Sequence, residues 1–535
     1  MKKIWTLSAS ILFIFWSGLF IYNTSFIAID GKRYFCLFDD AMISMRYGWN
    51  FAHGIGLVWD KGLRVEGVTN MLMTLYMSLA ALMFNKVVAV LFVQITGVML
   101  MLLIAYVNMN IAEEVFASSD CRNRNAFVLV SFIAVLFYYP LAYWSLMGME
   151  TSLIAVLILS ATLLVIRRDQ DARPVWLLPI LLGLAFITRP DSVVPATLIM
   201  ASRAFSLMSI NRKAIATLCK ELAVVLAFVL LLSLFRLVYY GDLVPNTYFL
   251  KLTGMPIEER IVNGLGFVGP FTLSVCAPLL LSLLGTLFGR HKSKYLLASL
   301  IFSSIAYQIW VGGDPWPYWR MTAPYVPLMF ILSLDALAEI TVRVRLLTAN
   351  KLYNHNSFGL RNVVIPLLGI ALLSIANLQF LPEMFLRVKP YQTSAAIANV
   401  NTAIALNNIT NQNASIAVFW AGSLPYYTDR RAIDLLGKSD KYIAHLPPDL
   451  SGDISWSGMR SVPGHNKYDL KYSILHLKPT YTQGLSWGRD NVSSHATNYK
   501  LFEYKGVNLL LDSDSSAVIW QKLDQGRSRR GMSNE

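Results

Sequence analysis

A succession of apolar segments long enough to cross a lipid bilayer restricts what this chain can fold into. The first segment runs from Ile4 to about Ile29, and charged residues make up only 15% of the 535-residue sequence. A soluble protein of this size carries about 25% charged residues. A bilayer core about 30 Å thick requires a helix of about 20 apolar residues. The sequence therefore predicts a polytopic α-helical membrane protein.

The segments predict about eleven transmembrane helices. The first is expected to be retained, because it is longer than a signal-peptide core and no small-residue cleavage motif follows it. Residues 71–84 are apolar but short, so we expect a re-entrant or surface-lying helix there. The predicted spans after the first are 87–110, 125–147, 150–166, 175–188, 192–208, 214–239, 269–288, 294–311, 321–338 and 363–381.

The net charge of +14 does not indicate a nucleic-acid partner, because the basic residues gather in alternate short loops. This is the distribution of the positive-inside rule, so we expect these loops to face the cytoplasm. The loops between them, which include the loop at 30–70, and the C-terminal region are then expected outside. The basic groups are Arg122 and Arg124; Arg167, Arg168 and Arg173; Arg203, Arg212 and Lys213; Arg290, His291, Lys292 and Lys294; and Arg343, Arg345, Lys351 and Arg361.

Residues 391–535 are polar and are expected to form a separate outer domain beside a membrane domain of residues 1–390. A helix-like stretch at 394–408 is followed by strand-like runs at 416–422, 472–477 and 507–512, which suggests a small α/β fold. None of the four cysteines lies in this region. Neither a disulfide framework nor a zinc site is predicted there.

Two adjacent carboxylates, Asp39 and Asp40, follow the first span. Neighbouring carboxylates repel each other, so one of them can hold a proton near neutral pH. They are candidates for a general base that deprotonates an acceptor hydroxyl; a divalent cation held by carboxylates is a variant. A solvated loop pair or a helix cap is the structural alternative. Glu66 is a further carboxylate on the same loop.

Two further outward segments combine cations with polar groups. Arg189 and Asp191 flank a proline between two spans, and a guanidinium there can bind a phosphate in a bidentate manner. Asn246, Tyr248 and Lys251 supply amide, hydroxyl and ammonium donors that suit a phosphate or a sugar. Anchoring in lipid headgroups is the alternative for both segments.

The segment GGDPWPYWR at 312–320 places Asp314 and Arg320 among aromatic rings. Sugar C–H faces pack on rings while carboxylates bind hydroxyls, so this segment indicates a carbohydrate site. In the C-terminal region, Tyr426, Asp434 and His465 lie in turn-rich stretches that indicate a binding surface.

These motifs together resemble membrane-embedded GT-C glycosyltransferases that use polyprenyl-phosphate sugars, and most closely the mycobacterial terminal β-(1→2)-arabinofuranosyltransferase family. A bacterial pilin arabinosyltransferase is a second relative. The resemblance rests on motifs in a fixed order: DDAMISMRYGWNFAHGIGLVWDKGLRVEGVTN, YWSLMGMET, ITRPDS, YYGDLVPNTYFLK, GGDPWPYWR, GSLPYYTDRRAIDLLGKSD and VPGH.

The resemblance implies a decaprenyl- or undecaprenyl-phosphate-linked arabinofuranose donor and an active site on the outer face of the bacterial inner membrane. Asp39 or Asp40 would be the base, with Asp39 preferred. Arg189 and Lys251 would hold the lipid phosphate. The sugar site would be lined by Glu66, Glu150 and Asp314.

The composition, rich in Lys, Asn, Ile and Ser, is more typical of a Gram-negative source, so the expected acceptor is a periplasmic glycan or protein rather than arabinan. One alternative is a GT-C transferase of mannose or aminoarabinose to protein or lipid A. Another is a lipid-sugar flippase or transporter. A transporter usually carries ionisable groups near the membrane midplane, and the predicted spans carry few.

Overall fold

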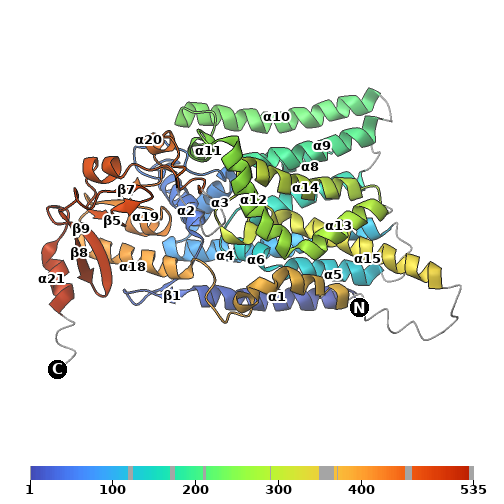
Figure 1. Cartoon of the computed structure of the whole chain (residues 1–535), viewed down its shortest axis with the longest axis horizontal. Helices are drawn as coiled ribbons and strands as arrows, with labels where there is room; N and C mark the ends of the chain where they lie inside the picture. The colour runs from blue at the N-terminus through green and yellow to red at the C-terminus, as the bar shows by residue number, and fades with distance from the viewer. Residues whose placement is uncertain are drawn as a thin grey trace.

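The computed structural model describes residues 2–117, 124–168, 175–208, 212–289, 291–348, 367–369, 371–451 and 461–528. The molecule is elongated, with a helical bundle at one end and a C-terminal domain at the other (Figure 1). Five residues of the basic loops, and the start of the predicted span at 363–381, lie outside these ranges. The five residues are Arg122, Arg173, Arg290, Lys351 and Arg361.

The bundle is that of a multi-pass membrane protein, as the sequence predicts. Within the described residues, six helices are long and apolar enough to cross a membrane. They are α1 (Lys2–Thr24), α4 (Lys86–Ala117), α10 (Arg212–Tyr240), α14 (Lys294–Val311), the stretch Ala323–Ile340, which combines η3 (Ala323–Tyr325) with the first part of α15 (Val326–Thr348), and Leu367–Met384.

Two bent pairs of helices are long and apolar enough to cross a membrane only if each pair is counted as one span, and several helices are shorter. The break between α5 and α6 bends the pair by 48°, and that between α12 and α13 by 85°. These helices are α5 (Arg124–Leu136), α6 (Tyr139–Leu146), α12 (Ile257–Ser274), α13 (Cys276–Phe288), α7 (Thr151–Arg167), α8 (Leu177–Thr188) and α9 (Val193–Met208). The predicted spans coincide with helices in their described parts, except that the two bends interrupt those predicted at 125–147 and 269–288, and α12 begins before the second of these.

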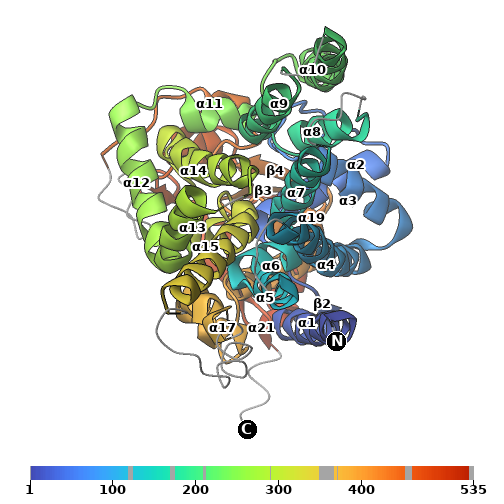
Figure 2. The same cartoon turned by 90° about the vertical axis from the view of Figure 1, so that its right-hand side faces the viewer.

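The helix α10 lies at the outside of the bundle beside α8 and α9 (Figure 2). Most of its apolar side chains are exposed, including Leu230, Leu231 and Val238. A helix that is apolar all round and unburied faces lipid. The end of α10 at Tyr240 leads directly into the polar end of the bundle.

Short helices close the end of the bundle that faces the C-terminal domain. They are α2 (Asp39–Ala52), α3 (Met71–Met83), η1 (Pro190–Ser192), α11 (Asn246–Leu252) and η2 (Pro317–Trp319). The predicted surface-lying segment is α3, which packs along α2 and leaves Leu75, Leu79 and Leu82 exposed. The outward motifs of the sequence therefore meet at one end of the bundle.

The C-terminal domain is an α/β unit built on a sheet of order β4-β3-β5-β9-β8. The pairs β3–β4 and β3–β5 are parallel, whereas β5–β9 and β8–β9 are antiparallel. Its elements are α18 (Thr393–Ile409), β3 (Ser415–Val418), α19 (Ser423–Thr428), β4 (Arg431–Asp434), α20 (Lys441–Ala444), β5 (Tyr481–Thr482), β8 (Tyr499–Tyr504), β9 (Val507–Asp512) and α21 (Trp520–Ser528).

The predicted helix at 394–408 and the strands near 416 and 507 are present as α18, β3 and β9. The strand predicted at 472–477 is wrong, because Lys471–His476 is helical. A short apolar run fits a strand and one face of a helix equally well. Here Ser473 and Ile474 are buried, and Leu470 and Ile474 pack into the smaller core of the domain.

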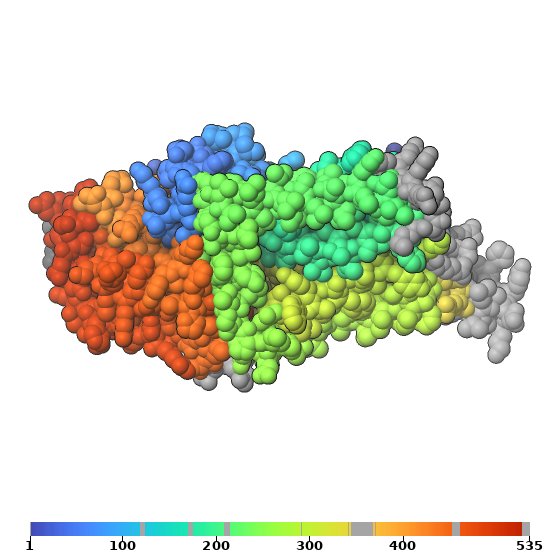
Figure 3. All heavy atoms as spheres, turned by 90° about the horizontal axis from the view of Figure 1, so that it is seen from above, coloured from blue at the N-terminus to red at the C-terminus, as the bar shows by residue number. Residues whose placement is uncertain are grey.

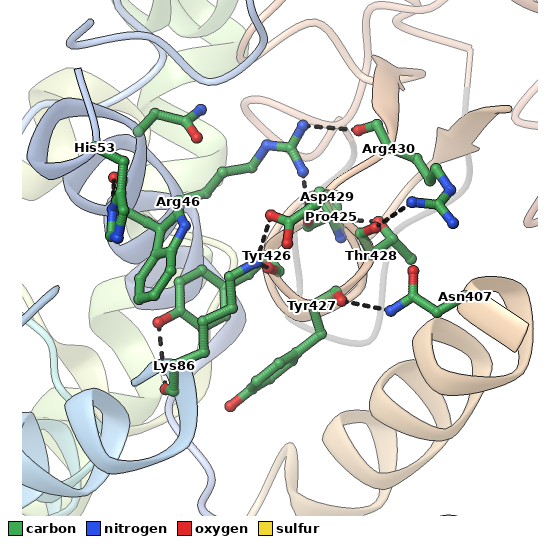
Figure 4. A network of polar contacts seen from close by, with 12 residues as sticks. Arg46, His53, Lys86, Asn407, Pro425, Tyr426, Tyr427, Thr428, Asp429 and Arg430 are labelled. Carbon is green, nitrogen blue, oxygen red and sulfur yellow. Dashed lines mark hydrogen bonds and ion pairs between the residues drawn. The ribbon is translucent and has the colours of Figure 1, made fainter. Parts of the chain in front are cut away.

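A buried arginine ties the C-terminal domain to α2 (Figure 4). Arg46 forms an ion pair of 3.1 Å with Asp60 and donates hydrogen bonds to the carbonyl oxygens of Pro425 and Arg430. The two carbonyls belong to α19 and the turn after it. The buried guanidinium thus has partners in both domains, and its removal would leave carbonyl groups unsatisfied.

A lysine at the start of α4 forms a second set of contacts between the two domains (Figure 4). The Lys86 ammonium donates to the Tyr426 carbonyl oxygen and to Asp429, and lies 5.1 Å from the ring centroids of Trp49 and Tyr426. Seen from above, the C-terminal domain also abuts the segment that carries α11 and α12 (Figure 3). The Asn263 amide donates to the Ser461 carbonyl oxygen there.

Candidate functional site

A cavity of about 320 Å³ opens where the bundle meets the C-terminal domain. Apolar side chains such as Phe186, Leu243 and Val311 line one part of it. The other part is polar, and its charged residues come from seven separate segments of the chain. Its charged lining residues are Asp40, Glu150, Arg189, Asp191, Arg236, Lys251, Asp314, Arg320 and Lys438.

Asp40 is the carboxylate at which several of these segments converge. It lies in the first turn of α2, where the helix dipole favours a negative charge. Its carboxylate lies 2.9 Å from the Arg320 guanidinium, contacts the Lys438 ammonium, and accepts a hydrogen bond of 3.2 Å from Trp316 Nε1. Although burial opposes ionisation, Lys438 and Arg320 hold the pKa of Asp40 well below its usual range.

The segment after α14 supplies the next carboxylate. Gly312 and Gly313, with φ of 95° and 72°, end α14 in the left-handed region that favours glycine. The chain then turns so that Asp314 accepts two bonds of 2.8 Å from Arg320. This bidentate pair fixes the guanidinium that reaches Asp40.

Lys251, on α11, is the most loosely paired cation of the cavity. Its ammonium lies 3.9 Å from the Asp314 carboxylate, longer than a hydrogen bond, and its side chain is 34% exposed. Burial lowers the pKa of Lys251 to about 8, so the group is still mostly charged at neutral pH. It therefore carries a charge that an incoming anion can approach.

Arg189 is fully engaged by carboxylates. Its guanidinium donates to Asp191 at 2.9 and 3.1 Å and to Glu150 at 2.5 Å. Glu150 in turn accepts a hydrogen bond of 2.9 Å from the Asn70 amide. This cluster lines part of the cavity, and its net charge is negative.

Asp39 does not line the cavity. Its carboxylate points to the C-terminal domain and accepts hydrogen bonds of 3.0 Å from the backbone N–H groups of Gly422 and Ser423. Burial raises the pKa of Asp39 to about 6, while the two N–H donors and Lys438 oppose the rise. The adjacent aspartates thus face different partners, as expected of successive positions about 100° apart on a helix.

Glu66 and Asn246 lie beside the cavity and not among its lining residues. Glu66 is buried and forms a bidentate pair with Arg236 of α10 at 2.8 and 3.0 Å. The Asn246 amide donates to backbone carbonyls of the segment that carries Lys438. Tyr248 lines the cavity from α11 and is half exposed.

The three predicted residues of the C-terminal domain also lie outside the cavity lining. Tyr426 is buried at the interface with α4 (Figure 4). The Asp434 carboxylate accepts hydrogen bonds from backbone N–H groups of its own turn. The ring of His465 lies 5.4 Å from that of Trp316, and burial together with Lys438 lowers its pKa to about 4, so it is neutral at pH 7.

Two charged lining residues were not singled out from the sequence. Lys438 comes from the C-terminal domain, where a lysine is ordinary. Arg236 lies near the end of the apolar segment 214–239, and an arginine in such a segment needs a partner. That signal alone could have identified Arg236.

The cavity residues do not fit a divalent cation. Within the described residues, no group of three or more His, Cys, Asp or Glu side chains is arranged to hold a metal ion. Asp40, Asp314, Glu150 and Asp191 each form an ion pair with arginine or lysine. A cation would have to displace these pairs, since its ligands are free carboxylate oxygens.

Comparisons with known proteins establish the fold. A family model described as a domain of unknown function (DUF8728) matches residues 387–518. No curated protein sequence matches the chain. Among solved structures, ArnT from Cupriavidus metallidurans bound to undecaprenyl phosphate is similar, with a TM-score of 0.52 and 11% identity over 95% of this chain and 98% of that one.

The archaeal oligosaccharyltransferase AglB from Archaeoglobus fulgidus, in complex with an inhibitory peptide and a dolichol-phosphate, is also similar. Its TM-score is 0.51, with 10% identity over 96% of this chain and 75% of that one. At such identities the likeness shows a shared fold. The predicted fold class, a GT-C-type helical membrane protein with a C-terminal α/β domain, is thereby confirmed.

Proposed function

We propose that this protein is a membrane glycosyltransferase that transfers D-arabinofuranose from a polyprenyl-phosphate donor to a periplasmic glycan or protein. The observation that carries the proposal is the cavity, which joins an apolar lining from the bundle to the cation-flanked carboxylate Asp40. A lipid-linked phosphate donor needs an apolar surface for its isoprenoid chain and a charged surface for its phosphate. Structures of the same fold bound to undecaprenyl phosphate and dolichol-phosphate support this assignment.

The donor is proposed to lie with its isoprenoid chain along Phe186, Leu243 and Val311, and its phosphate at Lys251. Lys251 is favoured over Arg189 because its carboxylate partner is 3.9 Å away, whereas Arg189 is already bonded to two carboxylates. Negative charge develops on the phosphate as the glycosidic bond breaks, and a positioned cation stabilises it.

Asp40 is proposed as the group that takes the proton of the acceptor hydroxyl, because it lines the cavity and Asp39 does not. In a single displacement, the acceptor oxygen forms a bond to the anomeric carbon as the bond from that carbon to the phosphate oxygen breaks. The acceptor proton passes to Asp40, and the lipid phosphate leaves with the electron pair.

The proposal places Asp40, the cavity and the C-terminal domain on the outer face of a bacterial inner membrane. The distribution of basic residues supports this orientation. The helix α2, which carries Asp40, lies at the end of the bundle beside the C-terminal domain (Figure 1). Arg124 and Arg167 contact Glu113 and Glu114 near the end of α4, whereas Lys86, at the start of α4, contacts the C-terminal domain.

The test is transfer by the purified full chain in liposomes. Radiolabelled polyprenyl-phosphate arabinofuranose and periplasmic extract are supplied, and label in a new glycosidic bond is measured. The expected result is transfer that Asp40→Asn abolishes. Transfer of mannose or aminoarabinose alone would overturn the sugar assignment and leave the enzyme class standing. Movement of the labelled lipid across the bilayer without a new bond would instead indicate a flippase.

A further inference from the structure

Both aspartates at the start of α2 bind the C-terminal domain. Asp39 accepts the backbone N–H groups at Gly422 and Ser423, where α19 begins. Asp40 contacts the side chain of Lys438, in the turn after β4. One helical turn of the membrane domain is thus attached to two separate segments of the C-terminal domain.

The turn that carries Lys438 is held from within its own domain. The Asp434 carboxylate, at the end of β4, accepts backbone N–H groups of Leu436 at 3.0 Å and Ser439 at 2.7 Å. Between them Gly437 adopts a φ of 78°, which favours glycine. These bonds and this backbone conformation define the shape of the turn, from which the Lys438 side chain reaches Asp40.

The same turn is held from the membrane domain. The Asn246 amide donates to the carbonyl oxygens of Gly437 at 2.9 Å and Lys438 at 3.0 Å. On the other side, a Cβ added at Gly67 would lie 2.8 Å from the Lys438 carbonyl oxygen, so the first outer loop touches the turn directly. Residues from three segments fix the backbone at Lys438, which is more than an ordinary surface lysine receives.

We propose that Lys438 is a positioning residue for Asp40, and that docking of the C-terminal domain, anchored by Asp39, completes the active site. The proposal rests on the proposed glycosyltransferase function. Asp39 then serves as an anchor, because its carboxylate accepts hydrogen bonds from the two backbone N–H groups at the start of α19. Asp40 is the catalytic residue, and its orientation and charge depend on a cation supplied by the other domain.

The charges that face Asp40 define what the loss of Lys438 would do. Arg320 remains as a direct partner, and Lys251 and His465 act at longer range. Asp39 and Asp314 are the nearest carboxylates, the latter neutralised by Arg320. Removing Lys438 leaves Asp40 with one direct cation, so its pKa rises and its carboxylate is held less firmly.

The first experiment measures kcat and KM separately for Lys438→Met and Lys438→Arg. Lys438→Met is expected to lower kcat while KM for the lipid donor changes little, because the cation that orients Asp40 is lost. Lys438→Arg is expected to recover part of kcat. The matched control is Lys441→Met, since Lys441 lies in the same domain and pairs with Asp242 at 2.5 Å outside the cavity. An unchanged kcat in Lys438→Met, or a failure of arginine to rescue, overturns the proposal.

The second experiment does not depend on finding a sugar substrate. The melting temperatures of Asp40→Asn, Lys438→Met and the double variant form a double-mutant cycle. The expected result is a double variant whose Tm falls by less than the sum of the two single changes. Additive changes overturn the pairing. A wild-type chain that transfers no sugar, with the coupling still present, overturns only the proposed function.

Discussion

The carboxylate of Asp40 lies 2.9 Å from Nη1 of Arg320, although 280 residues separate the two in the chain. This ion pair joins the first turn of α2 to the segment after α14, and the Asp314 carboxylate fixes its guanidinium from the other side. The candidate site therefore forms only when the first and last parts of the bundle pack together. Its function should be sensitive to single charges within this group.

Replacing Asp40 by asparagine should lower kcat by about 10²- to 10⁴-fold, the usual contribution of a general acid or base. The asparagine side chain keeps the size of the aspartate but cannot take the proton. Radiolabel transfer by the purified variant measures the effect, and retained expression with cooperative thermal unfolding shows that the chain still folds. The control is Asp242→Asn, outside the cavity, which should retain activity. A fully active Asp40→Asn protein would contradict the assignment of the base.

Replacing Lys251 by methionine should weaken donor binding. A charge-assisted hydrogen bond contributes about 1.5–3 kcal/mol, so we expect KM for the lipid donor to rise about 10- to 100-fold. Lys251→Arg should recover part of the loss, because the positive charge is retained. Initial rates over a series of donor concentrations test this. An unchanged KM would show that the phosphate lies elsewhere in the cavity.

The buried pair of Glu66 and Arg236 should stabilise the attachment of α10. Removing one partner leaves an uncompensated buried charge, which costs about 3–5 kcal/mol. Arg236→Met and Glu66→Gln should each lower Tm, and the double variant should recover a large part of the loss. Thermal unfolding in detergent measures all three. Equal additive losses would mean that the two groups do not act as a pair.

The anchor Asp39 should make the stability of the folded chain depend on pH. Its pKa in the folded state is about 6, above the value of about 3.9 for an unperturbed aspartate. The folded state therefore binds the proton more tightly, and the contribution of this group is fully present below pH about 4 and is lost as the pH rises through about 6. The Tm of the wild type minus that of Asp39→Asn should therefore fall over that interval. A difference that rises instead would contradict the direction of the shift.

A side chain at Gly422 should separate the two domains. A Cβ there would lie 2.1 Å from the backbone carbonyl oxygen of Asp39, a contact that cannot be relieved without moving backbone. Gly422→Ala should lower activity and increase proteolysis between the bundle and the domain. Gly269→Ala is the matched control, because a Cβ there meets nothing within 4 Å. Equal behaviour of the two variants would argue against a tight interface.

The sequence predicts the bundle well because length and apolar composition decide which segments span a membrane. It also points to Asp40, Asp314 and Arg320, since charged residues at the ends of apolar helices are conspicuous. Their convergence follows from the predicted topology, which assigns all three to one face. The different contacts of Asp39 and Asp40 cannot be predicted from the sequence, because they depend on the direction in which α2 presents each side chain.

Lys438 could not be identified in this way. A lysine in a polar domain is unremarkable by composition, and its approach to Asp40 depends on how two domains dock. The helix at Lys471–His476 was missed for a related reason: a run of six residues carries no period that separates strand from helix. Local pattern is informative inside a membrane span and much less so in a small α/β domain.

The turn that presents Lys438 follows every helix of the bundle in the chain. During synthesis, α2 and its aspartates enter the membrane first, and this lysine is translated only after the spans are complete. A nascent or truncated chain would hold Asp40 without its second cation and Asp39 without its backbone donors. Under the proposed glycosyltransferase function, the order of synthesis would act as a safeguard, because an incomplete chain could not transfer the lipid-linked sugar to water.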